Sequence, residues 1–179
     1  MYTKALTMKS LLKLFFVFAV ILGSLNMAHG QSTRKERQAA KAANVKNMID
    51  SVNYVFRANY AIPQGGGSRQ LTSEYDLKVV KGKIIAFLPY FGRAYVAPEP
   101  GTTEGGIKFT TTKFSYDAKQ GKKGNWEIVI KPKDNNITDW RDVQQLTLNI
   151  SPTGYASLQV ISSNRTSISF EGEIAKTDN

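Results

Sequence analysis

The sequence predicts a mainly β (α+β) protein. In it, an N-terminal amphipathic helix precedes seven to eight antiparallel strands, which form a meander curled into a barrel-like or two-layer sheet. Apolar residues first recur at a three-and-four spacing and then, from Leu71 onward, alternate with polar residues. The connections between the alternating segments are short, which requires antiparallel neighbours. Seven strands at about 4.8 Å spacing make a sheet about 30 Å wide, and one helix about 10–12 Å across cannot cover it, so the sheet must curl to bury its own apolar face.

The first 30 residues have the parts of a secretory signal peptide. Lysines give a basic start, the apolar run 14–22 is shorter than the about 20 residues that span a bilayer, and 28–30 (AHG) supplies small residues for cleavage. Met8 is a more typical start for such a peptide than Met1. Cleavage would leave residues 31–179 as a single globular domain and remove three lysines and no acid from a chain of formal charge +10. We therefore expect export to the periplasm or the cell exterior, with no transmembrane segment after cleavage.

The mature chain is expected to begin with a helix over about 33–58. Thr33 and Glu36 have the T-x-x-E spacing of a capping box, and the apolar residues after them lie mostly on one helical face. A proline and three successive glycines then end the pattern. This helix is expected to close one end of the barrel or to lie on its outside. Ile85 and Phe87, which are apolar on the otherwise polar side of their strand, are the predicted place for it to dock.

Alternation of apolar and polar residues predicts hairpins over about 71–175. The predicted strands are 75–79, 84–88, 109–116, 126–130, 146–150, 156–160 and 168–174, with 93–96 as a candidate eighth. Lys81-Gly82 is the expected turn of the first hairpin. In the second hairpin, Trp126, Ile128 and Ile130 are expected to share one face.

Composition excludes most metal and nucleophile chemistry in the mature chain. The protein has no cysteine, and its one histidine, His29, leaves with the predicted signal peptide. Zinc, haem or iron–sulfur sites built on these residues, Ser-His-Asp triads and cysteine nucleophiles cannot be assembled, so we predict no metal, cofactor or catalytic residue. Paired carboxylates remain available, but Glu171 and Glu173 fall on the polar face of their strand. Basic residues gather in the first half of the helix, yet export argues against a nucleic-acid partner.

The most unusual segment is 88–95 (LPYFGRAY), in which aromatic residues and an arginine surround a glycine. Its proline indicates a strand edge or a bulge, and its glycine permits a bend. Arg93 is then placed to stack on Tyr90 or Tyr95. We name Tyr90, Phe91, Arg93 and Tyr95 as candidate ligand- or partner-binding residues. The alternative is that the aromatics belong to the core and that Arg93 caps carbonyl groups.

Several separated motifs resemble those of one family. They are 56–60 (FRANY), 75–77 (YDL), 88–95 (LPYFGRAY), 106–109 (GIKF), 114–116 (FSY), 154–158 (GYASL), 163–165 (SNR) and 168–170 (ISF). In this order they are similar to the Bacteroidota family known as domain of unknown function 4251, over most of the chain from about residue 56 to residue 174. The resemblance implies an exported envelope protein of a Gram-negative bacterium and implies no mechanism.

Two functions of different classes fit these observations. The first is a non-enzymatic periplasmic or envelope binding or accessory protein, which holds an apolar or glycan-like ligand in the barrel mouth or on the 90–95 segment. The alternative is a cell-envelope interaction module that uses the same segment as a flat patch for another protein. An apolar cavity of at least about 300 Å³ would favour the first, and a filled barrel with exposed aromatics would favour the second. A hydrolase with two carboxylates ranks third.

Overall fold

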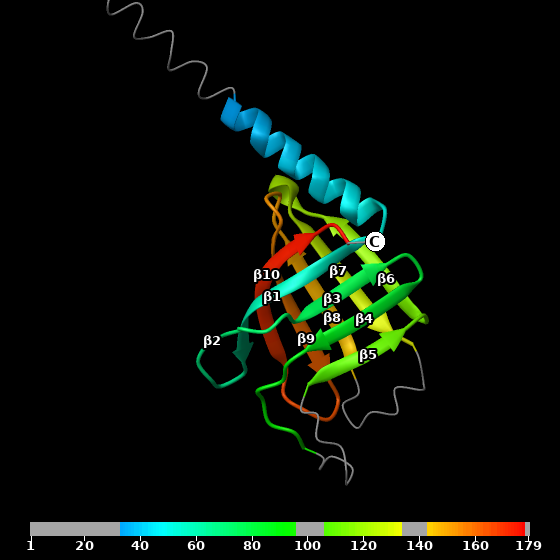
Figure 1. Cartoon of the computed structure of the whole chain (residues 1–179). Coiled ribbons are helices and arrows are strands. Elements are labelled where there is room, and N and C mark those ends of the chain that lie inside the picture. The colour runs from blue at the N-terminus through cyan, green and yellow to red at the C-terminus, as the bar shows by residue number, and fades with distance from the viewer. Residues whose placement is uncertain (1–32, 96–105, 134–142, 178–179) are drawn as a thin grey trace, which may run out of the picture. The chain divides into compact units, whose positions relative to one another are not determined.

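The computed structural model describes residues 33–95, 106–133 and 143–177, and the structural statements below concern these residues. The predicted signal peptide and its cleavage site lie outside them. The chain divides into two compact units, Met1–Ala40 and Lys41–Asn179. In the first unit, residues 33–40 form an exposed stretch of helix. The second unit contains the rest of that helix and the antiparallel strands (Figure 1).

The helix covers residues 33–50, so the predicted end near residue 58 is wrong. It ends in a Schellman motif, in which the Asn53 N–H donates to the Met48 carbonyl oxygen at 3.1 Å. The Val52 N–H donates to the Ile49 carbonyl oxygen, also at 3.1 Å. Val52 has a φ of 50°, a left-handed conformation that glycine usually supplies at this position. A valine there gives no stop signal in the sequence, so the helical spacing predicts continuation into what is in fact a strand.

The described residues contain ten strands and a short 3₁₀ turn, η1 (Lys122–Gly124). The strands are β1 (Tyr54–Pro63), β2 (Arg69–Gln70), β3 (Asp76–Val80), β4 (Lys83–Leu88), β5 (Ile107–Thr111), β6 (Phe114–Gln120), β7 (Trp126–Pro132), β8 (Val143–Ile150), β9 (Tyr155–Ser162) and β10 (Ile168–Ala175). They form one antiparallel sheet in the order β5-β4-β3-β1-β10-β9-β8-β7-β6, with β2 paired to β1. The predicted meander is confirmed, and β1, which the sequence assigned to helix and loop, lies at its centre. The candidate strand 93–96 is reduced to one bridge, Ala94 with Arg165, and Val96 lies outside the described residues.

The predicted strand 109–116 is two strands joined by a corner. β5 pairs with β4, and β6 pairs with β7, so the two halves belong to opposite ends of the sheet. Only Thr112 and Lys113 separate them, and the Thr111 hydroxyl holds the corner by accepting from the Lys113 N–H at 3.1 Å. Strands that change sheet at a bend are common corners in β proteins. Because a two-residue link joins the two ends of the strand order, the sheet is nearly closed and barrel-like.

Apolar side chains fill the barrel. One continuous core cluster contains residues from the helix, from β1, β3 to β5 and from β7 to β10. The predicted inward faces are confirmed, because Trp126, Ile128 and Ile130 are at most 9% exposed while Glu127 and Lys131 on the other face are exposed. Interior-facing side chains commonly fill small β-barrels. The fold therefore satisfies the condition that the sheet must bury its own apolar face.

Within the second unit, the last turns of the helix pack at one end of the barrel. Val45 and Ile49 belong to the core cluster, and the Lys46 Nζ lies 5.8 Å from the ring centroid of Trp126. The predicted docking place, Ile85 and Phe87, is wrong. Phe87 instead stacks on Tyr75, with ring centroids 5.5 Å apart. An aromatic residue just before β3, rather than the helix, therefore partners the outer face of β4.

Candidate functional site

Two connections meet at the other end of the barrel from the helix: residues 89–95, which follow β4, and residues 163–167, between β9 and β10 (Figure 1). The Thr166 N–H donates to the Arg93 carbonyl oxygen at 3.0 Å, and the Tyr95 N–H donates to the Asn164 carbonyl oxygen at 2.8 Å. Ala94 and Arg165 form an antiparallel bridge between these two bonds. We call residues 90–95 and 164–166 the clasp. It brings together two of the sequence motifs that carry the family resemblance.

The side chain of Tyr90 holds the clasp from within. Its hydroxyl oxygen lies 2.9 Å from the Arg93 carbonyl oxygen, 3.0 Å from the Thr166 carbonyl oxygen and 2.9 Å from the Thr166 Oγ1. The hydroxyl has one hydrogen to donate, to either carbonyl, and it can accept from the threonine hydroxyl. The Arg93 N–H also donates to the Thr166 Oγ1, at 3.2 Å. The Tyr90 hydroxyl therefore contacts both connections and holds them together.

Gly92 is required by this arrangement because a side chain would not fit. A Cβ at this position would lie 2.3 Å from the Tyr90 hydroxyl oxygen and 2.5 Å from the Thr166 Oγ1. Both atoms are fixed by the hydrogen bonds of the clasp. The sequence predicts that this glycine permits a bend, whereas the structure indicates that its role is close approach.

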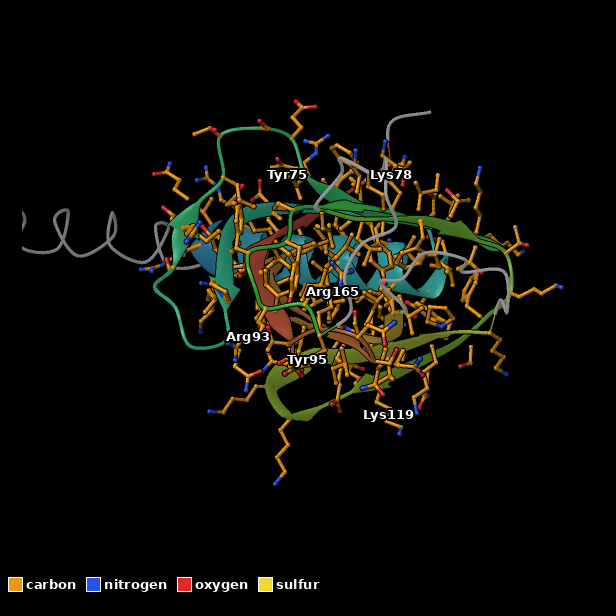
Figure 2. The ribbon with its side chains drawn as sticks, turned by 90° about the horizontal axis from the view of Figure 1, so that it is seen from below. Tyr75, Lys78, Arg93, Tyr95, Lys119 and Arg165 are labelled. Carbon is orange, nitrogen blue, oxygen red and sulfur yellow. The ribbon has the colours of Figure 1, made fainter. Side chains whose placement is uncertain are left out.

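Arg165 lies behind the Tyr90 ring. It is 2% exposed, and its Cζ is 4.3 Å from the ring centroid, which is a cation–π contact. Figure 2 shows Arg165 inside the ring of strands, with Arg93 and Tyr95 nearer the rim. The prediction placed Arg93 on Tyr90 or Tyr95, but the arginine on the Tyr90 face is Arg165. No local signal identifies Arg165, because its partner lies far away in the sequence.

The four candidate residues separate into two groups. Tyr90 is half-buried and supports the clasp, as the core alternative proposed for the aromatics. Phe91 is 36% exposed and Tyr95 is 66% exposed, and the Arg93 residue is also exposed. The Cζ of Arg69, from β2, lies 4.9 Å from the Phe91 ring centroid. The clasp therefore presents two aromatic rings beside cationic side chains on a backbone that several hydrogen bonds fix.

In the described parts of the chain, the groups with perturbed pKa values are two tyrosines near the opposite end of the barrel. The Tyr54 hydroxyl oxygen is 3.3 Å from the Tyr116 hydroxyl oxygen. Burial, followed by the charge of Tyr116 and the hydrogen bond to it, raises the pKa of Tyr54 well above its ordinary value. Burial also raises the pKa of Tyr116. A higher pKa keeps both phenols neutral, which suits a packing role better than proton transfer at neutral pH.

Little in the described residues supports catalysis or metal binding. No group of three or more His, Cys, Asp or Glu side chains in the described parts of the chain could hold a metal ion. Glu171 and Glu173 are exposed on the outer face of β10, as predicted. The described residues contain no helix that is both long enough and apolar enough to cross a membrane.

An open groove of about 630 Å³ is lined by residues of β6 to β10. Residues at equivalent heights on neighbouring strands supply its polar side chains, in the order Lys119, Glu127, Asn149, Ser157 and Glu171. No motif in the sequence predicts this groove. The alternation of polar and apolar residues predicts that each of these side chains faces solvent. That they lie side by side across the sheet depends on the strand register, which the sequence does not show.

The fold and the clasp define a filled antiparallel β-barrel protein whose candidate site is an exposed surface of aromatic and cationic residues. The model of the family "Domain of unknown function (DUF4251)" matches residues 36–174, and the chain belongs to this family. It is similar to the crystal structure of a DUF4251 family protein from Bacteroides eggerthii, with 17% identity and a TM-score of 0.54 over 78% of this chain and 91% of that one. At that identity the likeness is one of fold. No curated protein matches the chain.

Proposed function

We propose that this protein is an exported, non-enzymatic binding protein of the cell envelope that binds another protein through the outer surface of the clasp. The observation that carries the proposal is the exposure of Phe91, Arg93 and Tyr95 on a backbone that Tyr90 fixes. Aromatic residues and arginine are enriched where proteins bind one another. A fixed backbone lowers the entropy lost when these side chains meet a partner.

The filled interior supports a protein partner over a small apolar ligand. The inward-facing residues of β1, β3, β4 and β7 to β10 pack into the core cluster, so an apolar ligand inside the barrel would have to displace side chains. Pockets that hold small ligands are usually preformed and largely apolar. This was the criterion that separated the two expected functions, and it favours the interaction module.

The export half of the proposal is supported by the signal-peptide features of residues 1–30. Its test is to express the full chain in a Gram-negative host and to measure the mass of the mature protein in each cell fraction. We expect cleavage after Gly30 and recovery from the periplasm or the medium. An uncleaved chain in the cytoplasm would contradict export. It would not contradict the proposal that the clasp binds another protein.

The binding half is tested by comparing variants in a capture experiment from envelope extracts. The double variant R93A/Y95A should lose the protein that the wild type retains, while its melting temperature stays nearly unchanged. Tyr155→Ala is the matched control, because Tyr155 is 69% exposed but lies on β9, away from the clasp. Equal capture by R93A/Y95A and the wild type would contradict a role for the clasp.

The groove lined by β6 to β10 supports a second candidate, a glycan-like ligand. It combines polar side chains with the exposed ring of Tyr155, which also lines it. An aromatic face with neighbouring hydrogen-bonding groups suits a sugar ring, which has apolar and hydroxylated surfaces. On a glycan array, Tyr155→Ala and Asn149→Ala should then lose binding while R93A/Y95A keeps it, the reverse of the result expected for the clasp.

A further inference from the structure

Strand β6 has a free edge. It pairs with β7 over its full length, from Phe114 opposite Pro132 to Gln120 opposite Trp126. On its other side no strand among the described residues pairs with it. An unpaired edge presents a row of N–H and C=O groups that another strand can bind.

The hydrogen-bond pattern identifies which backbone groups of β6 face the free edge. At the two ends of the ladder, the Lys133 N–H donates to the Lys113 carbonyl oxygen at 2.7 Å, and the Gly121 N–H donates to the Asn125 carbonyl oxygen at 2.8 Å. Hydrogen-bonded pairs alternate along an antiparallel ladder. Between these two pairs, the odd-numbered residues of β6 therefore bond to β7. The N–H and C=O groups of Tyr116, Ala118 and Gln120 point away from β7.

Side-chain exposure distinguishes this edge from the rest of the barrel. Ile128 and Ile130 on β7 face inward and are fully buried. Their partners on β6, Ala118 and Tyr116, face the same way and are only partly buried. On the outer face, Asp117 and Lys119 form an ion pair of 3.1 Å within the strand, and their side chains are 59% and 72% exposed.

We propose that two copies of this chain associate by pairing their β6 edges antiparallel about Ala118. In this register, Ala118 lies opposite Ala118 of the second copy, and Tyr116 lies opposite Gln120. The backbone N–H and C=O groups of these residues face the edge that no described strand covers, so each pair can exchange two hydrogen bonds. A two-fold axis at Ala118 makes the interface self-complementary, as a symmetric dimer requires.

The charges on the outer face select this register. It places Asp117 of each copy opposite Lys119 of the other, in a non-hydrogen-bonded pair where side chains approach most closely. A shift by one position would place a residue whose backbone groups bond to β7 opposite one whose backbone groups face the free edge, so the hydrogen bonds could not form. A shift by two would place Asp117 opposite Asp117, or Lys119 opposite Lys119, and like charges directly opposite are unfavourable.

Charge-swap variants test the register by sedimentation velocity over a range of concentrations. The wild type should show a concentration-dependent dimer. Asp117→Lys should weaken it by about tenfold or more in dissociation constant, because both cross-strand pairs become repulsive. The double variant D117K/K119D again places opposite charges across the interface, in reversed order. It should return the dissociation constant of the dimer to within about threefold of the wild-type value.

The sedimentation experiment needs a control for the added positive charge. Glu74→Lys adds the same charge at an exposed position between β2 and β3, and it should leave the dimer unchanged. A wild type that stays monomeric at every concentration overturns the proposal. So does a dimer that D117K does not weaken or that the double swap does not restore.

Cysteine cross-linking gives an independent readout. The chain has no cysteine, so any disulfide in a single-cysteine variant joins two copies. Ala118→Cys places two sulfurs across the proposed axis at a Cα separation of about 5.5 Å, which a disulfide can span. Gln159→Cys is the control, because Gln159 is exposed on β9, which is paired on both sides. Faster cross-linking of A118C supports the dimer, and equal rates overturn it.

Discussion

The two ends of the barrel are closed by different physical means. At the helix end, apolar side chains close the barrel: Val45, Ile49, Tyr54 and Trp126 are at most 9% exposed and belong to one cluster. At the clasp end, hydrogen bonds close it, because the Tyr90 hydroxyl and the backbone bridge at Ala94 connect two loops.

This difference determines what each end presents to solvent. Closure by burial uses the apolar side chains themselves, so few remain on the surface. Closure by the hydroxyl of the half-buried Tyr90 and by backbone bonds leaves neighbouring aromatic side chains outside, and Phe91 and Tyr95 are exposed. Substitutions at the helix end should therefore lower global stability, whereas those at the clasp should separate stability from binding.

The largest expected effect is at the helix end. Trp126→Ala should lower the free energy of unfolding by about 3–5 kcal/mol, because it removes a large buried side chain and the ring beneath the Lys46 Nζ. Urea unfolding monitored by circular dichroism measures this loss. A loss below about 1 kcal/mol, typical of surface positions, would mean that the helix end is not closed by burial.

The next effect is at the clasp. Gly92→Ala should cost about 1–3 kcal/mol, because its Cβ would overlap the Tyr90 hydroxyl and force the loops apart. Gly67→Ala is the matched control, since a Cβ at Gly67 has no atom within 4 Å. If the two variants unfold at the same urea concentration, the clasp is not closely packed.

Tyr90→Phe isolates the hydroxyl from the ring. It should cost about 1–2 kcal/mol, because the carbonyl oxygen that accepts the single hydroxyl hydrogen loses its donor and the Thr166 hydroxyl loses a partner, while the ring that faces Arg165 is kept. Thr166→Val in the same background should then add less than it does in the wild type, since both changes remove one network. Additive losses would show that Tyr90 and Thr166 do not act together.

The strands could be predicted from the sequence wherever one face of the strand is buried and the other is exposed to solvent. The inward faces of β3, β4 and β7 to β10 follow from alternation alone, since a period of two leaves only one choice of buried face. β1 was missed for a local reason. Val52 ends the helix without a glycine, and the apolar residues at Val55 and Phe56 fit the helical spacing as well as a strand.

The clasp could be predicted only in part. The segment 88–95 was identified by its composition, but its partners lie in the 163–167 connection, and the Tyr90 hydroxyl bonds to a residue 76 positions away. A contact at that distance depends on the order of the strands. Sequence reasoning could therefore nominate Tyr90, Phe91, Arg93 and Tyr95 together, but it could not separate the residue that supports the clasp from those that it presents.

A pH-dependent effect is expected at the helix end and should be absent at neutral pH. The pKa of Tyr54 is raised above its ordinary value of 10.0 in the folded protein. Above that pH the unfolded chain loses this proton while the folded protein keeps it, so stability is complete below pH 10 and falls as pH rises. Urea unfolding at increasing pH should show that the free energy of unfolding falls less steeply above pH 10 in the double variant Y54F/Y116F than in the wild type. An unchanged slope would contradict burial as the cause of the shift.

The smallest effect on stability, and the sharpest contrast within the clasp, is expected for Tyr95→Ala. Tyr95 is 66% exposed, and its N–H bond to the Asn164 carbonyl oxygen belongs to the backbone, so the substitution should change the free energy of unfolding by less than about 0.5 kcal/mol. Partner capture should nevertheless fall, whereas Tyr90→Phe should lose stability and keep the exposed surface. A variant Y95A that unfolds as readily as Y90F would place Tyr95 in the support of the clasp and remove the distinction between its two aromatic groups.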